Sequence, residues 1–395
     1  MLETFLLIVI IVAAVALEIL RRNRATKSGR AGKPMGDGSS PAGHDRAGDS
    51  GDDAAVKKPR KPKAAAKRNT GDVDTPEAVP ASHPTKTSPA AERGPGPGHA
   101  PLARQAVGTG AFEGVRTWGY QLQKVVIGEV AASAFDVMVV DYSRDGSDDE
   151  AFTREEVAAM QTKADGSRRL VLAYMSIGEA ESYRYYWDPA WSVQKPAWML
   201  DENPDWKENY SVCFWEPGWQ AAFYGKPTSY LDKVLAAGFD GVYLDKCDVF
   251  EDLQARNKRV AASRPDLEGD MVSFISRLSH YAKARVPTFA IVMQNAEVLL
   301  EHEHLRQVID GVAKECLLYG LTSAERLNPR DEITFSRRAL DLAKSAGRTV
   351  FAVEYMGDAA KIRSAMETLD GYGYIATVSP KNKQLNRLNS DPATV

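Results

Sequence analysis

Carboxylates follow the ends of several short apolar runs in the second half of this 395-residue chain. Asp245 ends the run FDGVYLD, and Glu315 ends the run VIDGVAKE. Glycoside hydrolysis needs two such acids, one to protonate the leaving oxygen and one to act as nucleophile or base. A carboxylate beside a buried strand is costly without a partner or a task, so we interpret these acids as a functional site. The other polar residues placed in this way are Gln121, Asp141, Glu179, Glu181, Asp248, Gln294, Asn295, Glu297 and Glu354.

Histidine and cysteine are poorly placed for catalysis or for binding a metal. Three of the six histidines lie before residue 100 in a polar segment, and no histidine stands at the end of an apolar run. The three cysteines form no CxxC pair, which makes a zinc ribbon or a disulfide framework an unsuitable explanation. We therefore expect no metal and no cofactor, and we interpret Cys247 and Cys316 as small buried apolar groups.

Aromatic residues are concentrated in one segment. Six of the seven tryptophans lie between residues 182 and 238, a connection much longer than usual loops. Flat aromatic faces stack on sugar rings, and a cationic amino sugar adds roughly 0.5–2 kcal/mol. The alternative is that these rings pack against one another and form the hydrophobic core of a large loop. The aromatic residues that we expect to contact a sugar are Tyr183, Trp187, Trp191, Trp215 and Tyr319.

The elements that must position these residues alternate between two types after about residue 109. Helix-length segments such as 154–164 and 271–285 separate short apolar runs. Eight strands with crossovers predict a (β/α)8 TIM barrel, which carries its active site at the C-terminal ends of the strands. An open doubly wound sheet is the alternative, but the chain has no GxGxxG or Gly-Lys-Ser/Thr loop where that fold needs one. The expected strands lie within 118–123, 135–143, 169–181, 239–248, 288–297, 308–320, 349–356 and 373–380.

Two sequence phrases carry a family resemblance. YMSIGEAESYRYYW (174–187), followed by Trp-rich sequence, and GFDGVYLDKCD (238–248) resemble the endo-α-1,4-polygalactosaminidase family of glycoside hydrolases. MQNAE (293–297) and AKECLLYG (313–320) follow in the order that the family shows. The resemblance extends over about residues 113–380, and it implies a barrel without a metal that cleaves within an α-1,4-linked polymer of galactosamine and N-acetylgalactosamine.

The resemblance also implies roles for individual residues. The family's acid on the fourth strand corresponds to Asp245, and its acid on the sixth strand corresponds to Glu315. We therefore expect Asp245 to be the nucleophile or the carboxylate that stabilises the transition state, and Glu315 to be the general acid. Glu297 is assigned to substrate binding. This chain has extra residues after Asp248, so the family's pattern does not predict the sugar subsites near that position.

The charge of the chain favours a cationic partner. Residues 69–395 hold 36 basic and 46 acidic residues, a net charge of −10. An acidic domain attracts a partly deacetylated amino-sugar polysaccharide and repels uronic-acid polymers and nucleic acid. Two other functions stay open: a catalytically silent barrel that only binds polysaccharide, and a hydrolase of another α-linked glycan.

The N-terminal part of the chain differs from the rest. Residues 1–21 are mostly apolar, with no charged residue from Phe5 to Leu17, and we expect a transmembrane anchor there, with a cleaved signal peptide as the alternative. Residues 22–108 are rich in Gly, Pro, Ala and charged residues, which predicts a disordered basic linker. Its stretch 57–68 is either a solvated basic segment or a contact for anionic lipid or nucleic acid. The barrel is expected over 109–384, with a polar tail at 385–395.

The expected location follows from two opposing arguments. The arginines directly after the apolar segment favour a cytoplasmic C-terminal side. A hydrolase of exopolysaccharide, however, acts outside the cytoplasm, and a long linker lets the barrel reach polymer away from the bilayer. We expect a periplasmic or extracellular catalytic domain, held to the membrane by the N-terminal helix, with exopolysaccharide synthesis or secretion machinery as a partner.

Overall fold

The structure is a computed structural model, and it describes residues 110–389. The expected anchor (1–21) and the expected linker (22–108) lie outside the described residues. Within residues 110–389, no helix has both the length and the apolar character that a membrane span requires.

Eight parallel strands form the centre of the fold. Neighbours along the chain lie side by side, in the order β1-β2-β3-β7-β8-β9-β10-β11. The two ends of this sheet approach each other, and the Trp118 Nε1 donates a hydrogen bond of 3.0 Å to the Ile375 carbonyl. This near-closed arrangement confirms the predicted (β/α)8 barrel. The strands are β1 (Trp118–Tyr120), β2 (Val137–Val140), β3 (Leu170–Ser176), β7 (Gly241–Asp245), β8 (Ala290–Gln294), β9 (Gly311–Glu315), β10 (Thr349–Tyr355) and β11 (Ile375–Ser379).

The segment after β11 fills the seam between the first and last strands. The Asn389 side chain accepts a hydrogen bond from the Tyr120 amide at 2.8 Å and donates one to the Val378 carbonyl at 2.8 Å. The Leu385 carbonyl accepts hydrogen bonds from the amides of Leu122 and Gln123. Buried backbone groups need such partners, so residues 385–389 take the place of ladder bonds that the short β1 does not make.

Alternate residues of the strands point into the barrel or towards the helices, as the two-residue period of a strand requires. The interior is aromatic: the Tyr243 ring lies 5.2 Å from the Tyr120 ring and 6.1 Å from the Trp118 ring, measured between centroids. These side chains are almost completely buried. The barrel interior is therefore a packed core that closes the floor beneath the strand ends.

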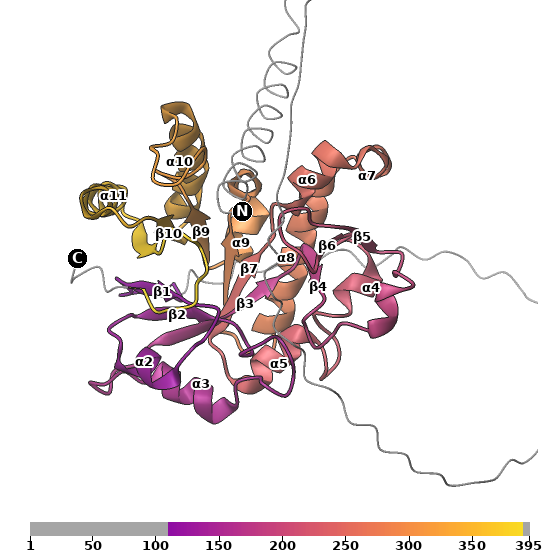
Figure 1. The fold of residues 1–395 in the computed structure, drawn as a ribbon, viewed down its shortest axis with the longest axis horizontal. Coiled ribbons are helices and arrows are strands. Elements are labelled where there is room, and N and C mark those ends of the chain that lie inside the picture. The colour runs from indigo at the N-terminus through magenta and orange to yellow at the C-terminus, as the bar shows by residue number, and fades with distance from the viewer. Residues whose placement is uncertain (1–109, 390–395) are drawn as a thin grey trace, which may run out of the picture. The chain divides into compact units, whose positions relative to one another are not determined.

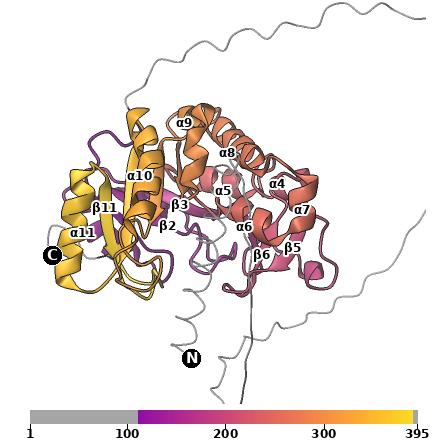
Figure 2. The same cartoon turned by 90° about the horizontal axis from the view of Figure 1, so that it is seen from above.

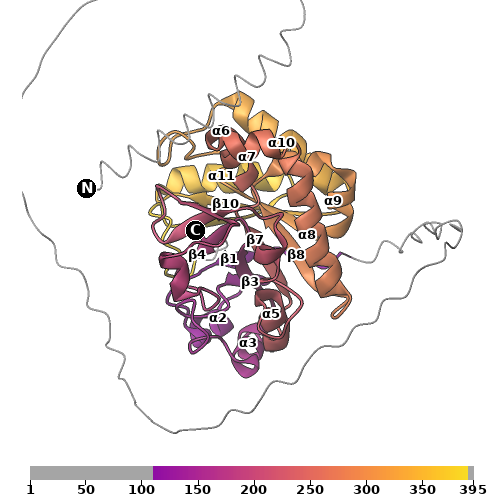
Figure 3. The same ribbon diagram turned by 90° about the vertical axis from the view of Figure 1, so that its right-hand side faces the viewer.

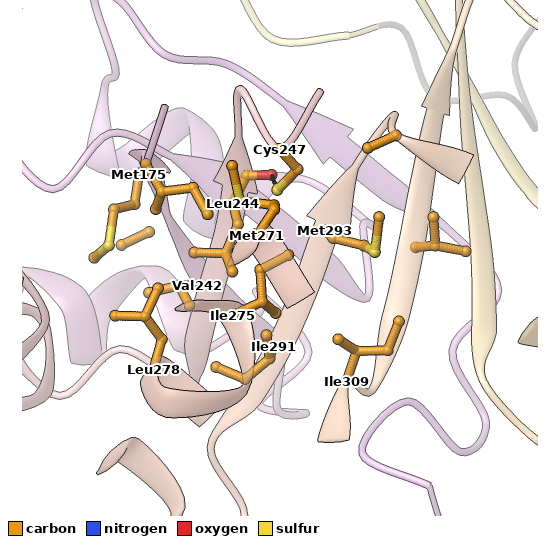
Figure 4. Packing of buried hydrophobic residues seen from close by; sticks show 14 of the residues in the cluster. Met175, Val242, Leu244, Cys247, Met271, Ile275, Leu278, Ile291, Met293 and Ile309 are labelled. Carbon is orange, nitrogen blue, oxygen red and sulfur yellow. Dashed lines mark hydrogen bonds between the residues drawn. The ribbon is translucent and has the colours of Figure 1, made fainter. Parts of the chain in front are cut away.

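A helical layer covers the outside of the barrel. In Figure 3 strands β1, β3, β7 and β8 lie at the centre, and α2, α3, α5, α8 and α9 lie around them. Figure 4 shows how α8 packs: Met271, Ile275 and Leu278, one face of the helix, meet outward-facing residues of β7 and β8. The covering helices are α2 (Ile127–Ala132), α3 (Arg154–Gln161), α5 (Tyr230–Ala237), α8 (Leu267–Lys283), α9 (Glu303–Val308), α10 (Arg330–Ser345) and α11 (Ala359–Gly371).

Further elements follow the C-terminal ends of three strands. After β3 an insertion forms a small antiparallel sheet in the order β4-β6-β5. Figures 1 and 2 show this sheet on the same side of the barrel as the two helices that follow β7. Because active sites of this fold lie at these strand ends, the extra elements form the surroundings of the site. They are β4 (Glu179–Glu181), η1 (Pro189–Ser192), β5 (Met199–Glu202), β6 (Asn209–Val212), α4 (Pro217–Gln220), α6 (Val249–Arg256), α7 (Lys258–Ser263) and η2 (Glu297–Glu301).

Candidate active site

Asp245 and Glu315 lie at the same end of the barrel. They are the last residues of β7 and β9, with β8 between these strands. Each follows an interior residue by two positions, so both side chains face the interior mouth. Burial, and next the negative charge of Glu315, raise the pKa of Asp245 to about 7. Glu315 is therefore close enough for its charge to act on the ionisation of Asp245.

The chain turns sharply after each strand in this region. Lys246, Asn295 and Cys316, which directly follow β7, β8 and β9, have φ values of 58°, 55° and 52°. Non-glycine residues adopt this left-handed conformation at a cost, and such residues cluster at functional sites. Three neighbouring strands with this feature indicate that the turns serve to hold the strand-end side chains at the mouth.

Each of the two acids accepts a hydrogen bond from an interior tyrosine. The Tyr174 hydroxyl donates to Asp245 Oδ2 at 2.5 Å, and the Tyr355 hydroxyl donates to Glu315 Oε1. The Tyr120 hydroxyl donates to Gln294 Oε1 at 3.3 Å. The sequence did not single out these tyrosines. Strand register could have found two of them: Tyr174 pairs with Tyr243, two residues before Asp245, and Tyr355 lies two residues after Val353, the partner of Glu315.

Asn295 holds Glu315 from two sides. Its Nδ2 donates to Glu315 Oε2 at 3.3 Å, and its Oδ1 accepts from the Glu315 amide at 3.1 Å. The expected site residue Asn295 thus belongs to the site, and it orients an acid. Asp245 is oriented in a similar way, because its Oδ1 accepts from the Lys246 amide at 2.7 Å.

Asp141 and Glu181 are joined by one arginine. The Arg184 guanidinium contacts Asp141 Oδ1 and Glu181 Oε2, both at 2.6 Å, and all three side chains are buried. Its guanidinium carbon also lies 5.3 Å from the centre of the Tyr183 ring. The structure therefore gives these two acids an internal partner, and their burial needs no substrate to explain it.

Glu179 connects the insertion to the strand end of β7. Its Oε1 lies 3.1 Å from Lys246 Nζ and accepts from Asn203 Nδ2 at 2.7 Å. Lys246 directly follows Asp245, so this contact fixes the inserted sheet beside the mouth. Asp248 lies one turn further along the chain, and burial raises its pKa.

Four expected site residues make hydrogen bonds or ion pairs that involve neither Asp245 nor Glu315. Glu297 contacts Lys314 Nζ at 3.1 Å and accepts a hydrogen bond from Ser336 on α10. Glu354 faces outwards from β10, and its carboxylate accepts from the amides of Leu318 and Tyr319. Gln121 donates to the carbonyls of Gln123 and Lys124. These contacts organise loops; none of them is with Asp245 or Glu315. The four residues are Gln121, Glu297, Tyr319 and Glu354.

The tryptophans of the insertion pack mainly against one another. Trp187, Trp191, Trp198 and Trp219 form a continuous series with centroid distances of 5.4, 5.0 and 5.0 Å. Trp198 and Trp219 are buried, so these two rings belong to the hydrophobic core of the insertion. Trp187 and Trp191 remain partly exposed at one end of the series. Trp206, with 57% of its surface exposed, is the most accessible of the described tryptophans.

A parallel barrel with two carboxyl groups facing its C-terminal mouth is an arrangement typical of glycoside hydrolases. The family model of glycoside-hydrolase family GH114 matches residues 100–389. The chain therefore belongs to this family, and it is a glycoside hydrolase by membership. This confirms the family that the sequence resemblance indicated.

Relatives and a solved structure agree with this assignment. An uncharacterised protein of Methanocaldococcus jannaschii is 35% identical over 284 residues, which cover 69% of this chain and 78% of the relative. An uncharacterised protein of Deinococcus radiodurans is 33% identical over 277 residues, covering 69% and 82%. The glycoside hydrolase domain of PelA from Pseudomonas aeruginosa superposes with a TM-score of 0.52 at 17% identity, covering 69% of this chain and 96% of that domain. The last likeness supports the fold.

Proposed function

We propose that the protein is an endo-acting hydrolase of exopolysaccharide built from α-1,4-linked galactosamine and N-acetylgalactosamine. The observation that carries this proposal is the pair of Asp245 and Glu315 at the mouth of a GH114 barrel. The acidic character of residues 69–395 supports a cationic substrate.

In the proposed reaction Asp245 acts as the nucleophile or stabilises the oxocarbenium-like transition state. The Tyr174 hydroxyl and the Lys246 amide hold its two oxygens and favour its ionised form. Glu315 donates its proton to the leaving oxygen. Its Oε1 accepts from the Tyr355 hydroxyl and its Oε2 accepts from the Asn295 side-chain amide, so both oxygens are held in position by fixed donors.

The test is the release of reducing ends from galactosamine polymer, chitosan and pectin by the purified protein. We expect release from galactosamine polymer, and loss of about 10³-fold or more with Asp245→Asn or Glu315→Gln. Release from chitosan alone would indicate another amino-sugar polymer. Binding of galactosamine polymer without release would indicate a barrel that only binds polysaccharide.

We also propose that the catalytic domain works in the periplasm or outside the cell, tethered near exopolysaccharide machinery. The apolar N-terminal segment and the polar stretch after it support this location. A reporter that is active only in the cytoplasm, fused after residue 70, tests it. Activity of that reporter would overturn the proposal.

A further inference from the structure

A lysine from the end of the chain lies beside the proposed general acid. The segment that follows β11 runs along the seam of the barrel and is fixed there through Leu385 and Asn389. Lys383 lies on this segment with a φ of 54°. Its Nζ lies 4.9 Å from the centre of the Tyr355 ring, and the Tyr355 hydroxyl donates to Glu315. The barrel closure thus brings a cation to the β9–β10 side of the mouth.

The two nearest groups to this ammonium are uncharged. One is the Tyr355 ring, and the other is the thiol of Cys316. Burial raises the pKa of Cys316 to about 11, so the thiol is uncharged at neutral pH. Glu354 also lies near Lys383, but burial raises the pKa of Glu354 to about 7, so at neutral pH its carboxyl is only partly ionised.

The negative charge that influences Lys383 changes during the proposed reaction. Glu315 contributes to raising the pKa of Lys383, so the two groups interact when Glu315 is ionised. A general acid must carry its proton before the glycosidic bond breaks, because it gives that proton to the leaving oxygen. In that state Glu315 is neutral, and the positive charge of Lys383 acts on the bound sugar, screened in part because Lys383 is exposed to solvent.

The opposite side of the mouth has the opposite charge. The segment after β7 holds Asp248 and Asp252. Burial, and next the negative charge of Asp248, raises the pKa of the intervening Glu251 to about 8, so Glu251 is mostly uncharged at neutral pH. A polymer with free amino groups is attracted to the β7 side and repelled near Lys383. An N-acetylated sugar has no ammonium and meets no such repulsion.

We propose that Lys383 makes the subsite beside Glu315 selective for N-acetylgalactosamine over galactosamine. This inference rests on the proposed function. It assigns the two sugars of a partly deacetylated polymer to different sides of the cleft, the free amine towards β7 and the N-acetyl group towards β10.

The experiment compares two α-1,4-linked hexasaccharides, one of galactosamine and one of N-acetylgalactosamine. The measured quantity is the ratio of kcat/KM for the amine form to that for the acetylated form, at low ionic strength because salt screens the effect. Lys383→Gln should raise this ratio about tenfold, Lys383→Glu should raise it further, and Lys383→Arg should keep the wild-type ratio. Lys381→Gln is the matched control: it removes the same charge two residues away and should leave the ratio unchanged.

The outcomes separate this inference from the proposed function. If the wild-type protein cleaves the hexasaccharides and both Lys383→Gln and Lys383→Glu keep its ratio within twofold, the inference fails and the proposed function stands. If Lys381→Gln shifts the ratio as much as Lys383→Gln, the selectivity comes from the total positive charge of the segment. The assignment to Lys383 then fails. If the wild-type protein neither cleaves nor binds either hexasaccharide, both proposals fail.

Discussion

The Tyr174 hydroxyl lies 2.5 Å from Oδ2 of Asp245 and donates a hydrogen bond to it. The two residues come from the neighbouring strands β3 and β7, and Tyr174 is largely buried. Burial and the charge of Glu315 favour the protonated form of Asp245, whereas this hydrogen bond favours the ionised form and so lowers its pKa. Tyr174 therefore helps to keep the proposed nucleophile ionised.

Removal of this hydroxyl should move the pH dependence of the reaction. In Tyr174→Phe the pKa of Asp245 rises further, so the acidic limb of the profile of kcat/KM against pH should shift to higher pH, by roughly one unit. Tyr230→Phe is a suitable control, because its hydroxyl donates to the Tyr174 carbonyl and contacts neither acid. Equal acidic limbs in the parent protein and Tyr174→Phe would contradict the role given to Tyr174.

Asp245 should also reduce the stability of the fold at alkaline pH. Its pKa is raised in the folded protein from 3.8 to about 7. The native state therefore binds more protons than the unfolded state between about pH 4 and 7, so this group's contribution to stability falls as the pH rises through that window. Above about pH 7 the buried carboxylate is ionised in the folded protein, and its destabilising effect on the fold is complete.

Asp245→Asn removes this penalty. We expect the variant to be more stable than the parent at pH 8, by on the order of 1 kcal/mol or more, which corresponds to a few degrees in Tm. The advantage should shrink as the pH falls towards 4. Glu354, whose pKa burial raises to about 7, titrates in both proteins and cancels in the difference. Thermal unfolding of both proteins at pH 4, 6 and 8 measures the effect, and a pH-independent difference would argue against it.

The sequence predicted the eight strands and the strand-end positions of Asp245 and Glu315, because both depend on local patterns. Apolar runs mark buried parallel strands, and Asp245 and Glu315 end such runs. Which face a strand-end acid occupies depends on alternation counted from the barrel interior. Glu354 is adjacent to the interior residue Tyr355 and therefore faces outwards, where it binds two loop amides. The pattern of acids alone does not contain this distinction.

Other parts of the site depend on partners that are distant in sequence. Glu297 is satisfied by Lys314 and by Ser336, which lies 39 positions away. Lys383 reaches the mouth only because the end of the chain returns to the seam between β1 and β11. Such contacts form only when the barrel closes, so the residue pattern of a single strand does not predict them.

Arg184 should be essential for stability. Replacement of Arg184 by Met leaves the buried carboxylates of Asp141 and Glu181 without their partner, and breaking a buried pair in this way costs about 3–5 kcal/mol. Arg168→Met is the comparison, because the Arg168 side chain is 60% exposed in its ion pair with Asp240 and should contribute at most about 1 kcal/mol. Urea unfolding of both variants tests this, and similar losses in both would contradict a structural role for the buried pair.

The assignment of the general acid can be tested by changing the leaving group. A substrate with an activated aryl leaving group needs no proton to depart, so a variant that lacks only the general acid regains much of its rate of glycosidic cleavage on it. Glu315→Gln should show this recovery, and Asp245→Asn should not, because an activated leaving group does not replace a nucleophile or a stabilising charge.

Glu297→Gln provides the matched comparison, since it makes the same change in an acid that the sequence placed near the site. Its carboxylate binds Lys314 and Ser336, so the variant should lose stability and keep its dependence on the leaving group. Rates with activated and unactivated substrates, measured for all three variants at equal amounts of folded protein, distinguish these cases. Recovery in Glu297→Gln together with none in Glu315→Gln would move the general acid from β9 to the end of β8.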